Sequence, residues 1–188
     1  RSARLALASL IAVALTAHLL IALSRDDGLT VVQFISRFAV LANLAAVVTL
    51  AMLAFRPERD EHGVFASIRG AVTVYMTITA ILYIIALARS LADLAAPESW
   101  IDWVIHLVGP LGVLIDWVIN PPRAELDLRA PGWWVVAPAA YLAYALVRGA
   151  IVGWYPYTFL DPANGGYAPV ALWSIGVIGV VLGLGFAC

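Results

Sequence analysis

One apolar stretch of this sequence carries a histidine and an aspartate at a spacing that suits acid–base chemistry. In WIDWVIHLVGPLGVLIDWVI, residues 100–119, Asp102 and His106 lie four positions apart, so on a helix they face the same side, one turn from each other. A carboxylate in that position can accept the imidazole N–H, which fixes the tautomer and raises the basicity of the ring. We therefore take His106 as a candidate general base and Asp102 as the acid that orients it.

Each ionisable group in this stretch also has a plainer interpretation. Asp102 and Asp116 lie toward its two ends, where a carboxylate can reach polar headgroups and avoid the cost of burial in hydrocarbon. His106 lies some six residues in, roughly 9 Å below the edge at the rise of a helix, so headgroups explain it less well. Its plain alternative is a histidine that is hydrogen-bonded within the protein core.

A second polar stripe runs along the apolar segment 31–55. Gln33, Ser36 and Asn43 follow one another at i, i+3 and i+10 and share a helix face loosely. A hydroxyl beside an imidazole suits nucleophilic acyl transfer. We expect Ser36 at the depth of His106 and take it as the candidate nucleophile, with Asn43 as a contact to substrate or developing charge. The alternative is that these residues only hydrogen-bond between membrane helices.

Three further polar residues are predicted at the same depth, and we expect them to contact the substrate: His18, Tyr144 and Arg148. Arg148 could hold a substrate carboxylate or a developing oxyanion, or it could extend from a helix end into the headgroup layer. A metal site is a weaker hypothesis, because no H-x-x-x-H or H-E-x-x-H spacing exists and His18, His106 and Asp102 would have to converge by chance. We expect no metal and no cofactor.

The composition indicates what kind of element must position these side chains. Of the 188 residues, 63% are hydrophobic and 12% are charged, whereas a soluble domain is about half apolar and about a quarter charged. The sequence therefore predicts a membrane protein. The net charge of −1 gives no reason to expect a nucleic acid partner. All 11 basic residues are arginine, and with the abundance of Ala, Val and Leu this suggests a bacterial source.

Apolar segments separated by polar breaks predict an all-α, polytopic membrane protein, a bundle of six transmembrane helices forming a single domain over residues 1–188. Each segment has roughly 20 residues, enough to cross about 30 Å of hydrocarbon. The predicted spans are about 3–24, 31–55, 64–92, 100–119, 133–152 and 168–187. The chain begins without Met, and we expect both ends to be trimmed.

The arginines orient this predicted bundle. Seven lie on the side of the N-terminus: Arg1, Arg4, Arg56, Arg59, Arg69, Arg123 and Arg129. Four lie on the other side or close to it: Arg25, Arg37, Arg89 and Arg148. Because cytoplasmic loops carry the excess of basic residues, we expect both termini in the cytoplasm and the protein in a bacterial plasma membrane.

The segment RGAIVGWYPYTFLDPANGGY, residues 148–167, is rich in aromatic residues, Pro and Gly for a connection between spans. It resembles the Arg-Gly, Tyr-Pro-Tyr-x-Phe-Leu-Asp and Gly-Tyr pattern of bacterial six-helix relatives of the androgen-induced protein family. Two other parts of the chain are similar to that family. They are FISRFAVLAN, residues 34–43, and the series His106, Pro110, Leu114, Asp116, Trp117, Pro121 and Pro122. The resemblance covers residues from about 31 to about 170.

The resemblance implies a transmembrane hydrolase of fatty-acid esters of hydroxy fatty acids that uses an intramembrane threonine and histidine. The histidine corresponds to His106. The nucleophile corresponds to Ser36 in one alignment, which also matches an amide residue to Asn43, and to Ala39 in another, which cannot attack an ester. We prefer Ser36. Tyr157, in the Tyr-Pro-Tyr segment, joins the residues expected to contact substrate.

The sequence thus predicts an integral-membrane hydrolase of fatty-acyl esters with a hydroxyl nucleophile, whose partners are the bilayer and a lipid or acyl-ester substrate. The alternative is a non-enzymatic lipid-binding or small-molecule transport protein that uses the same polar cavity. A third hypothesis is a scaffold whose polar residues only pack.

Overall fold

The computed structural model describes residues 1–24, 30–55, 63–87 and 99–187, and every regular element among them is a helix. Six helical segments in that part of the chain are long and apolar enough to cross a membrane. They are Ser2–Ser24, Phe38–Phe55, Gly63–Ile85, Trp100–Ile119, Ala130–Val152 and Tyr167–Ala187. The predictions of an all-α fold and of six apolar spans are therefore confirmed. Residues 88–92 of the predicted third span lie outside the described residues.

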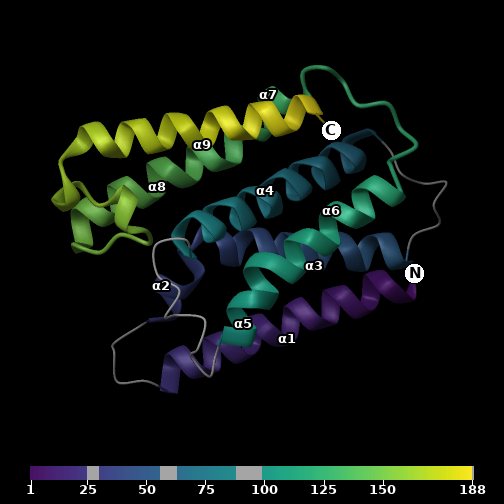
Figure 1. Ribbon diagram of the computed structural model, residues 1–188, viewed down its shortest axis with the longest axis horizontal. Coiled ribbons are helices and arrows are strands. Elements are labelled where there is room, and N and C mark those ends of the chain that lie inside the picture. Colours follow the sequence, from purple (N-terminus) through teal and green to yellow (C-terminus); the bar gives the residue numbers. More distant parts are fainter. Residues whose placement is uncertain (25–29, 56–62, 88–98, 188) are drawn as a thin grey trace. The chain divides into compact units, whose positions relative to one another are not determined.

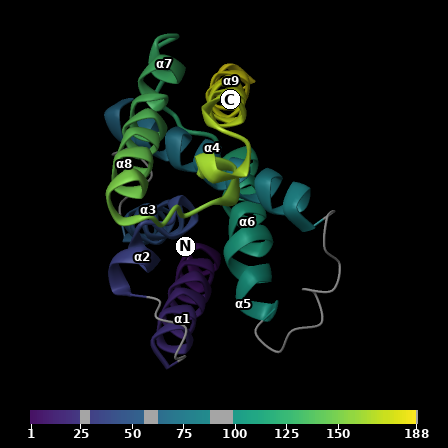
Figure 2. The ribbon, with the colours of Figure 1, turned by 90° about the vertical axis from the view of Figure 1, so that its left-hand side faces the viewer.

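The chain divides into two compact units, residues 1–126 and 127–188, where the sequence predicts one domain. The first unit contains α1 (Ser2–Ser24), α2 (Val31–Ile35), α3 (Phe38–Phe55), α4 (Gly63–Leu87), α5 (Ser99–Trp103), the π-helix Val104–Val108 and α6 (Gly109–Ile119). In this unit α1 packs on α3, α3 on α4 and α4 on α6 (Figure 1, Figure 2). The second unit contains α7 (Ala130–Trp134), α8 (Val136–Val152), the 3-10 helices Thr158–Leu160 and Pro162–Asn164, and α9 (Tyr167–Ala187).

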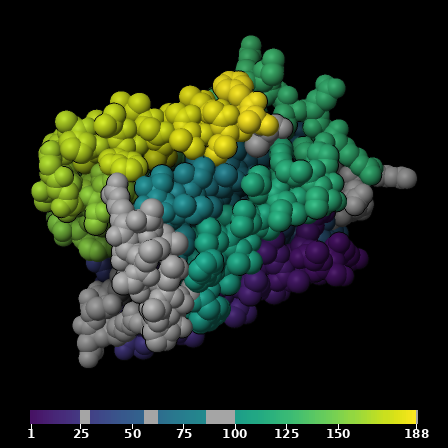
Figure 3. Space-filling model, viewed as in Figure 1, coloured from purple at the N-terminus to yellow at the C-terminus, as the bar shows by residue number. Residues whose placement is uncertain are grey.

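Small residues let the helices of the first unit approach one another closely. Ala8 of α1 and Ala42 and Ala46 of α3 are buried in one apolar core. On α6, a Cβ added at Gly112 would come within 2.6 Å of the Leu7 side chain of α1, and these two helices run side by side on the face that Figure 3 shows. Small residues at helix contacts are typical of membrane proteins, in which close packing replaces the hydrophobic effect between helices.

The outer faces of the same helices are apolar. Val13, Leu20, Val48 and Ile115 are each more than half exposed. Water would not favour such a surface, whereas lipid tails solvate it at no cost. The helices therefore have the surface of a multi-pass membrane protein.

The second predicted span, 31–55, contains two helices. α2 begins with a capping box, in which Thr30 Oγ1 accepts from Gln33 N at 3.1 Å and Gln33 Oε1 accepts from Thr30 N at 2.8 Å. It ends at Ile35 with Ser36 as its C-cap, and α3 begins at Phe38. The predicted nucleophile therefore lies at a helix end and not within a continuous helix.

Candidate active site

The helix of the fourth span changes its hydrogen-bond pattern at the candidate base. Val104–Val108 form a π-helix, and the Gly109 N–H donates to Val104 O, five residues back. Ile105 O thereby loses the donor that an α-helix would give it at Gly109. The next residue, Pro110, has no N–H to offer. Such π-helical turns are frequent at functional sites, and this one contains His106.

Asn43 of α3 supplies the donor that Ile105 lacks. Its Nδ2 donates to Ile105 O at 3.0 Å and to Ala39 O at 2.8 Å, and the side chain is fully buried. Both N–H groups of the amide are thereby used, so none is left for a developing oxyanion. The Oδ1 atom is buried and has no hydrogen-bond partner among the described residues. Asn43 is therefore available as an acceptor, for a water molecule or a substrate hydroxyl.

The His106 imidazole is held at one nitrogen and along one face. Its Nδ1 lies 3.1 Å from the main-chain oxygen of Asp102 and 3.9 Å from the carboxylate Oδ1 of the same residue. Because a carbonyl oxygen can only accept, the short contact assigns the proton to Nδ1 and leaves the lone pair on Nε2. Tyr83 of α4 stacks on the ring, with the ring centres 4.6 Å apart and the planes at 10°. The main chain of Asp102 thus fixes the tautomer, while the carboxylate lies at ion-pair distance.

Ser36 lies fully buried where α2 ends. Its hydroxyl donates to Val32 O at 2.6 Å. The next residue, Arg37, brings Nη1 within 3.4 Å of Nε2 of His18 on α1, and because a guanidinium only donates, that nitrogen of His18 is the acceptor. Phe34 packs edge-on against the same imidazole, with ring centres 5.3 Å apart.

These side chains make up one polar layer of the first unit. Asp102, His18 and Arg37 all lie close enough to His106 to act on it electrostatically. They come from α5, α1 and the break between α2 and α3, and Ser36 adjoins Arg37 in the chain. The layer offers an imidazole lone pair at His106 and a cation at Arg37, and the Ser36 hydroxyl lies one residue from that cation in the chain. A hydroxyl, a base and a cation are the components that acyl transfer requires.

Arg148, Tyr144 and Tyr157 belong to the second unit. The guanidinium carbon of Arg148 lies 5.2 Å from the centre of the Trp154 ring, a cation–π contact, and its Nη1 is buried without an acceptor among the described residues. Tyr144 is exposed, and Tyr157 stacks on Phe159 at 5.2 Å. These three predicted substrate contacts thus lie on α8 and in the loop that follows it.

That loop is ordered by its own hydrogen bonds. Gly153, with φ 69°, ends α8 in the left-handed conformation that glycine adopts without strain. Asp161 Oδ1 accepts from Ala163 N at 2.9 Å, and Asn164 Nδ2 donates to Thr158 O at 3.0 Å. The segment with the family resemblance therefore has a defined conformation, held by hydrogen bonds, at the end of α8.

Two residues of the polar layer, Arg37 and Tyr83, were not predicted. A continuous helix over 31–55 turns Arg37 away from the face of Ser36, whereas the observed helix end lets it reach His18. The T-x-x-Q sequence at residues 30–33 is a recognised helix-start signal and could have indicated the short helix. Tyr83 carries no such signal, because its role depends on how α4 packs.

Comparison of this sequence with models of protein families, with curated proteins and with solved structures found no match. The functional conclusion therefore depends on the geometry of the polar layer and on the chemistry of its residues.

Proposed function

We propose that this chain is an integral-membrane hydrolase of fatty-acyl esters and a relative of the androgen-induced protein family, in the plasma membrane of a bacterium. The observation that carries the proposal is the His106 imidazole, a base whose tautomer is fixed by Asp102 O inside an apolar span. The resemblance of the Tyr-Pro-Tyr segment and the distribution of arginines in the sequence support the family and the location.

In the proposed reaction, Ser36 Oγ attacks the ester carbonyl carbon while its proton passes to Nε2 of His106. The ester C–O bond then breaks, and the alcohol leaves with that proton. A water molecule cleaves the acyl-serine by the same route and returns the proton to Ser36. The Ser36 hydroxyl now donates to Val32 O, so attack requires that this donation pass to His106.

The roles proposed for the other residues of the polar layer follow from which of their atoms can still bind. Asn43 Oδ1, buried and without a donor among the described residues, accepts from the hydrolytic water. Arg37 supplies positive charge near His106 as the oxyanion develops. The apolar outer faces of the helices let an acyl chain approach from the bilayer. Arg148, Tyr144 and Tyr157 stay predicted contacts to the substrate.

The nucleophile can be tested by covalent labelling. Purified protein in a neutral detergent is treated with a long-chain alkyl fluorophosphonate, which phosphonylates activated serine hydroxyls, and its intact mass is measured. We expect one adduct on the wild type, none on Ser36→Ala, and labelling slowed by about 10²-fold or more on His106→Ala, because the base is lost.

Thr16→Ala is the matched control, since Thr16 is an exposed hydroxyl on α1 that donates to Ala12 O at 2.8 Å. It should be labelled at the wild-type rate. An adduct that persists on Ser36→Ala, or a wild type that forms none, would contradict the proposal.

One observation favours a second function, a lipid-binding protein without turnover. The fully buried Ser36 hydroxyl already has an acceptor at Val32 O, as it would in a helix end that only needs to be capped. A wild type that forms no adduct but retains acyl lipids through purification, and loses them on Asn43→Leu, would identify this function.

A further inference from the structure

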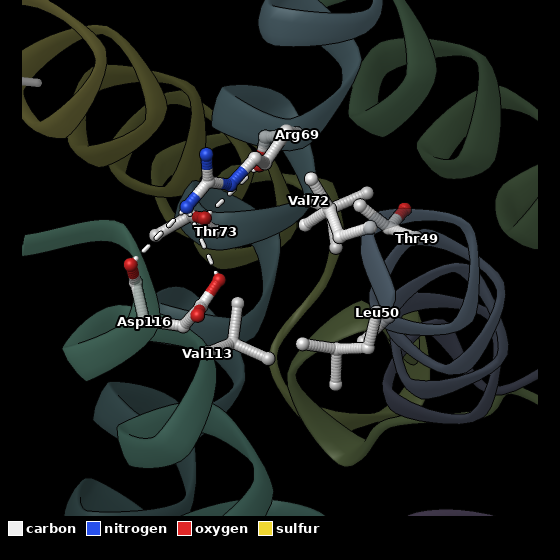
Figure 4. A pocket seen from close by; sticks show the side chains of 9 residues that line it. Thr49, Leu50, Arg69, Val72, Thr73, Val113 and Asp116 are labelled. Atoms are coloured by element: carbon white, nitrogen blue, oxygen red, sulfur yellow. Dashed lines mark hydrogen bonds and ion pairs between the residues drawn. The ribbon is translucent and has the colours of Figure 1, made fainter. Parts of the chain in front are cut away.

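A second polar cluster lies in the first unit, away from His106, where α1 and α4 begin and α6 ends. Arg4 Nε donates to Asp116 Oδ1 at 2.7 Å, and Arg69 Nη2 donates to Oδ2 of the same carboxylate at 3.1 Å. Figure 4 shows the contact between Arg69 and Asp116. Asn120 Nδ2 also donates to Oδ1, at 3.1 Å. The side chains of Arg4 and Asp116 are only 12% and 13% exposed. The carboxylate is therefore shared by two arginines and an amide.

Arg4 keeps binding capacity after this pairing. Its Nη1 and Nη2 make no hydrogen bond to the described residues, and neither is enclosed. Arg1 lies three positions earlier, immediately before α1. Its guanidinium carbon lies 5.6 Å from the centre of the Phe55 ring, and it makes no ion pair with the described residues. Two arginines at the start of the first span thus keep guanidinium N–H donors that the described residues do not use.

The cavity beside this cluster limits where a ligand can lie. It is lined by hydroxyl, charged and apolar side chains, among them Thr49, Thr73, Arg69 and Asp116 (Figure 4). The space holds about one water molecule, too little for a larger anion. A ligand must therefore bind on the outer side of the Arg4–Asp116 pair, at the Nη edge of Arg4.

We propose that Arg1 and Arg4 bind a phosphate group, either of an anionic lipid headgroup or of free phosphate. A guanidinium fork matches phosphate oxygens in geometry and charge. The bond from Nε to Asp116 orients Arg4, so less side-chain freedom is lost on binding. Both arginines lie at the start of the first apolar span, Ser2–Ser24. At the ends of spans phosphate is the abundant anion of a bilayer, and basic pockets between helices bind acidic headgroups. This site does not depend on ester hydrolysis.

The test measures the thermal unfolding midpoint of delipidated protein in neutral detergent. It is titrated with phosphatidylglycerol, with inorganic phosphate, and with potassium chloride at matched ionic strength. We expect phosphatidylglycerol or phosphate to raise the midpoint above the chloride control. The half-saturating concentration should increase about tenfold in Arg4→Gln, as expected for the loss of one charge-assisted hydrogen bond. Saturation by lipid alone assigns the headgroup, and saturation by both assigns phosphate in general.

Two further variants keep this test decisive. Arg1→Gln weakens binding without touching the bond to Asp116, so it serves if Arg4→Gln is poorly folded. Arg129→Gln removes an exposed arginine that bonds to the described residues through its main-chain atoms, and it should respond like the wild type. A wild type that responds to neither form of phosphate beyond chloride overturns the proposal, as do wild-type half-saturation values in both Arg1→Gln and Arg4→Gln.

Discussion

The polar side chains of the first unit differ in which of their atoms are still available. Asn43 has both N–H groups committed, to Ala39 O and Ile105 O, and His106 has its Nδ1–H committed to Asp102 O. What remains is Oδ1 of the amide and Nε2 of the imidazole, and both are acceptors. The site is therefore suited to take hydrogen bonds and protons from hydroxyl groups and water.

Asn43→Leu should lower the free energy of unfolding by about 1–2 kcal/mol, because Ile105 O is left without a donor in an apolar interior. A denaturant titration in micelles measures this. Asn164→Ala removes a comparable amide bond, to Thr158 O, from an exposed loop, and should change the free energy by less than about 0.5 kcal/mol.

Pro110→Ala separates the loss of the hydrogen bond to Ile105 O from the loss of packing around Asn43. It restores a main-chain N–H five residues after Ile105. In that background Asn43→Leu should cost less, and the non-additivity is the measured coupling. Equal losses in the two backgrounds would mean that Asn43 does not act through the Ile105 carbonyl.

The sequence indicated which side chains meet more often than it indicated which of their atoms make the contact. The i, i+4 spacing predicted a contact between Asp102 and His106, and they are in contact, but the short distance is to the main-chain oxygen. Spacing could not show this, because it depends on the π-helical turn. The turn also leaves Ile105 O to accept from Asn43 of another helix, a contact that spacing within one helix does not encode.

At the level of elements, the π-helix requires a glycine at its end. A Cβ at Gly109 would lie 2.9 Å from Val104 O and 3.2 Å from the Ile11 side chain of α1. The carbonyl is backbone and cannot move aside without changing the turn. The close approach between the fourth span and α1 therefore depends on this position.

Gly109→Ala should accordingly destabilise the protein by about 1–3 kcal/mol, the usual cost of overpacking, as measured by its unfolding midpoint in detergent. Gly176→Ala is the control, because a Cβ there meets nothing within 4 Å, and the higher helix propensity of alanine should leave stability unchanged or raise it by up to about 1 kcal/mol. If both variants unfold like the wild type, the turn does not need glycine.

The predicted span 31–55 does not correspond to one continuous helix. Apolar length alone predicted one span over 31–55, and the helix long enough to cross a membrane there is Phe38–Phe55. The Thr30 capping box starts a separate five-residue helix, Val31–Ile35, with Ser36 as its C-cap. Hydropathy measures transfer into lipid and is insensitive to such a break. Only the local cap sequence carries that information.

For the whole molecule, composition was sufficient to predict the fold class and the six apolar spans, because lipid requires every spanning segment to satisfy its own backbone. It could not predict the division into two compact units. It also did not predict that Asp116, expected near an interface, is paired with Arg4 and Arg69. Charges that lie far apart in the sequence meet through helix packing, which hydropathy does not encode.

The central claim is that His106 acts as the base of an ester hydrolase. The most direct test is the rate at which purified protein in lipid vesicles hydrolyses a fluorogenic long-chain acyl ester. His106→Ala should reduce turnover by about 10²–10⁴-fold. His62→Ala, which removes the histidine of the polar RPERDEHG segment, should leave it unchanged. Equal turnover by the wild type and His106→Ala would contradict the account.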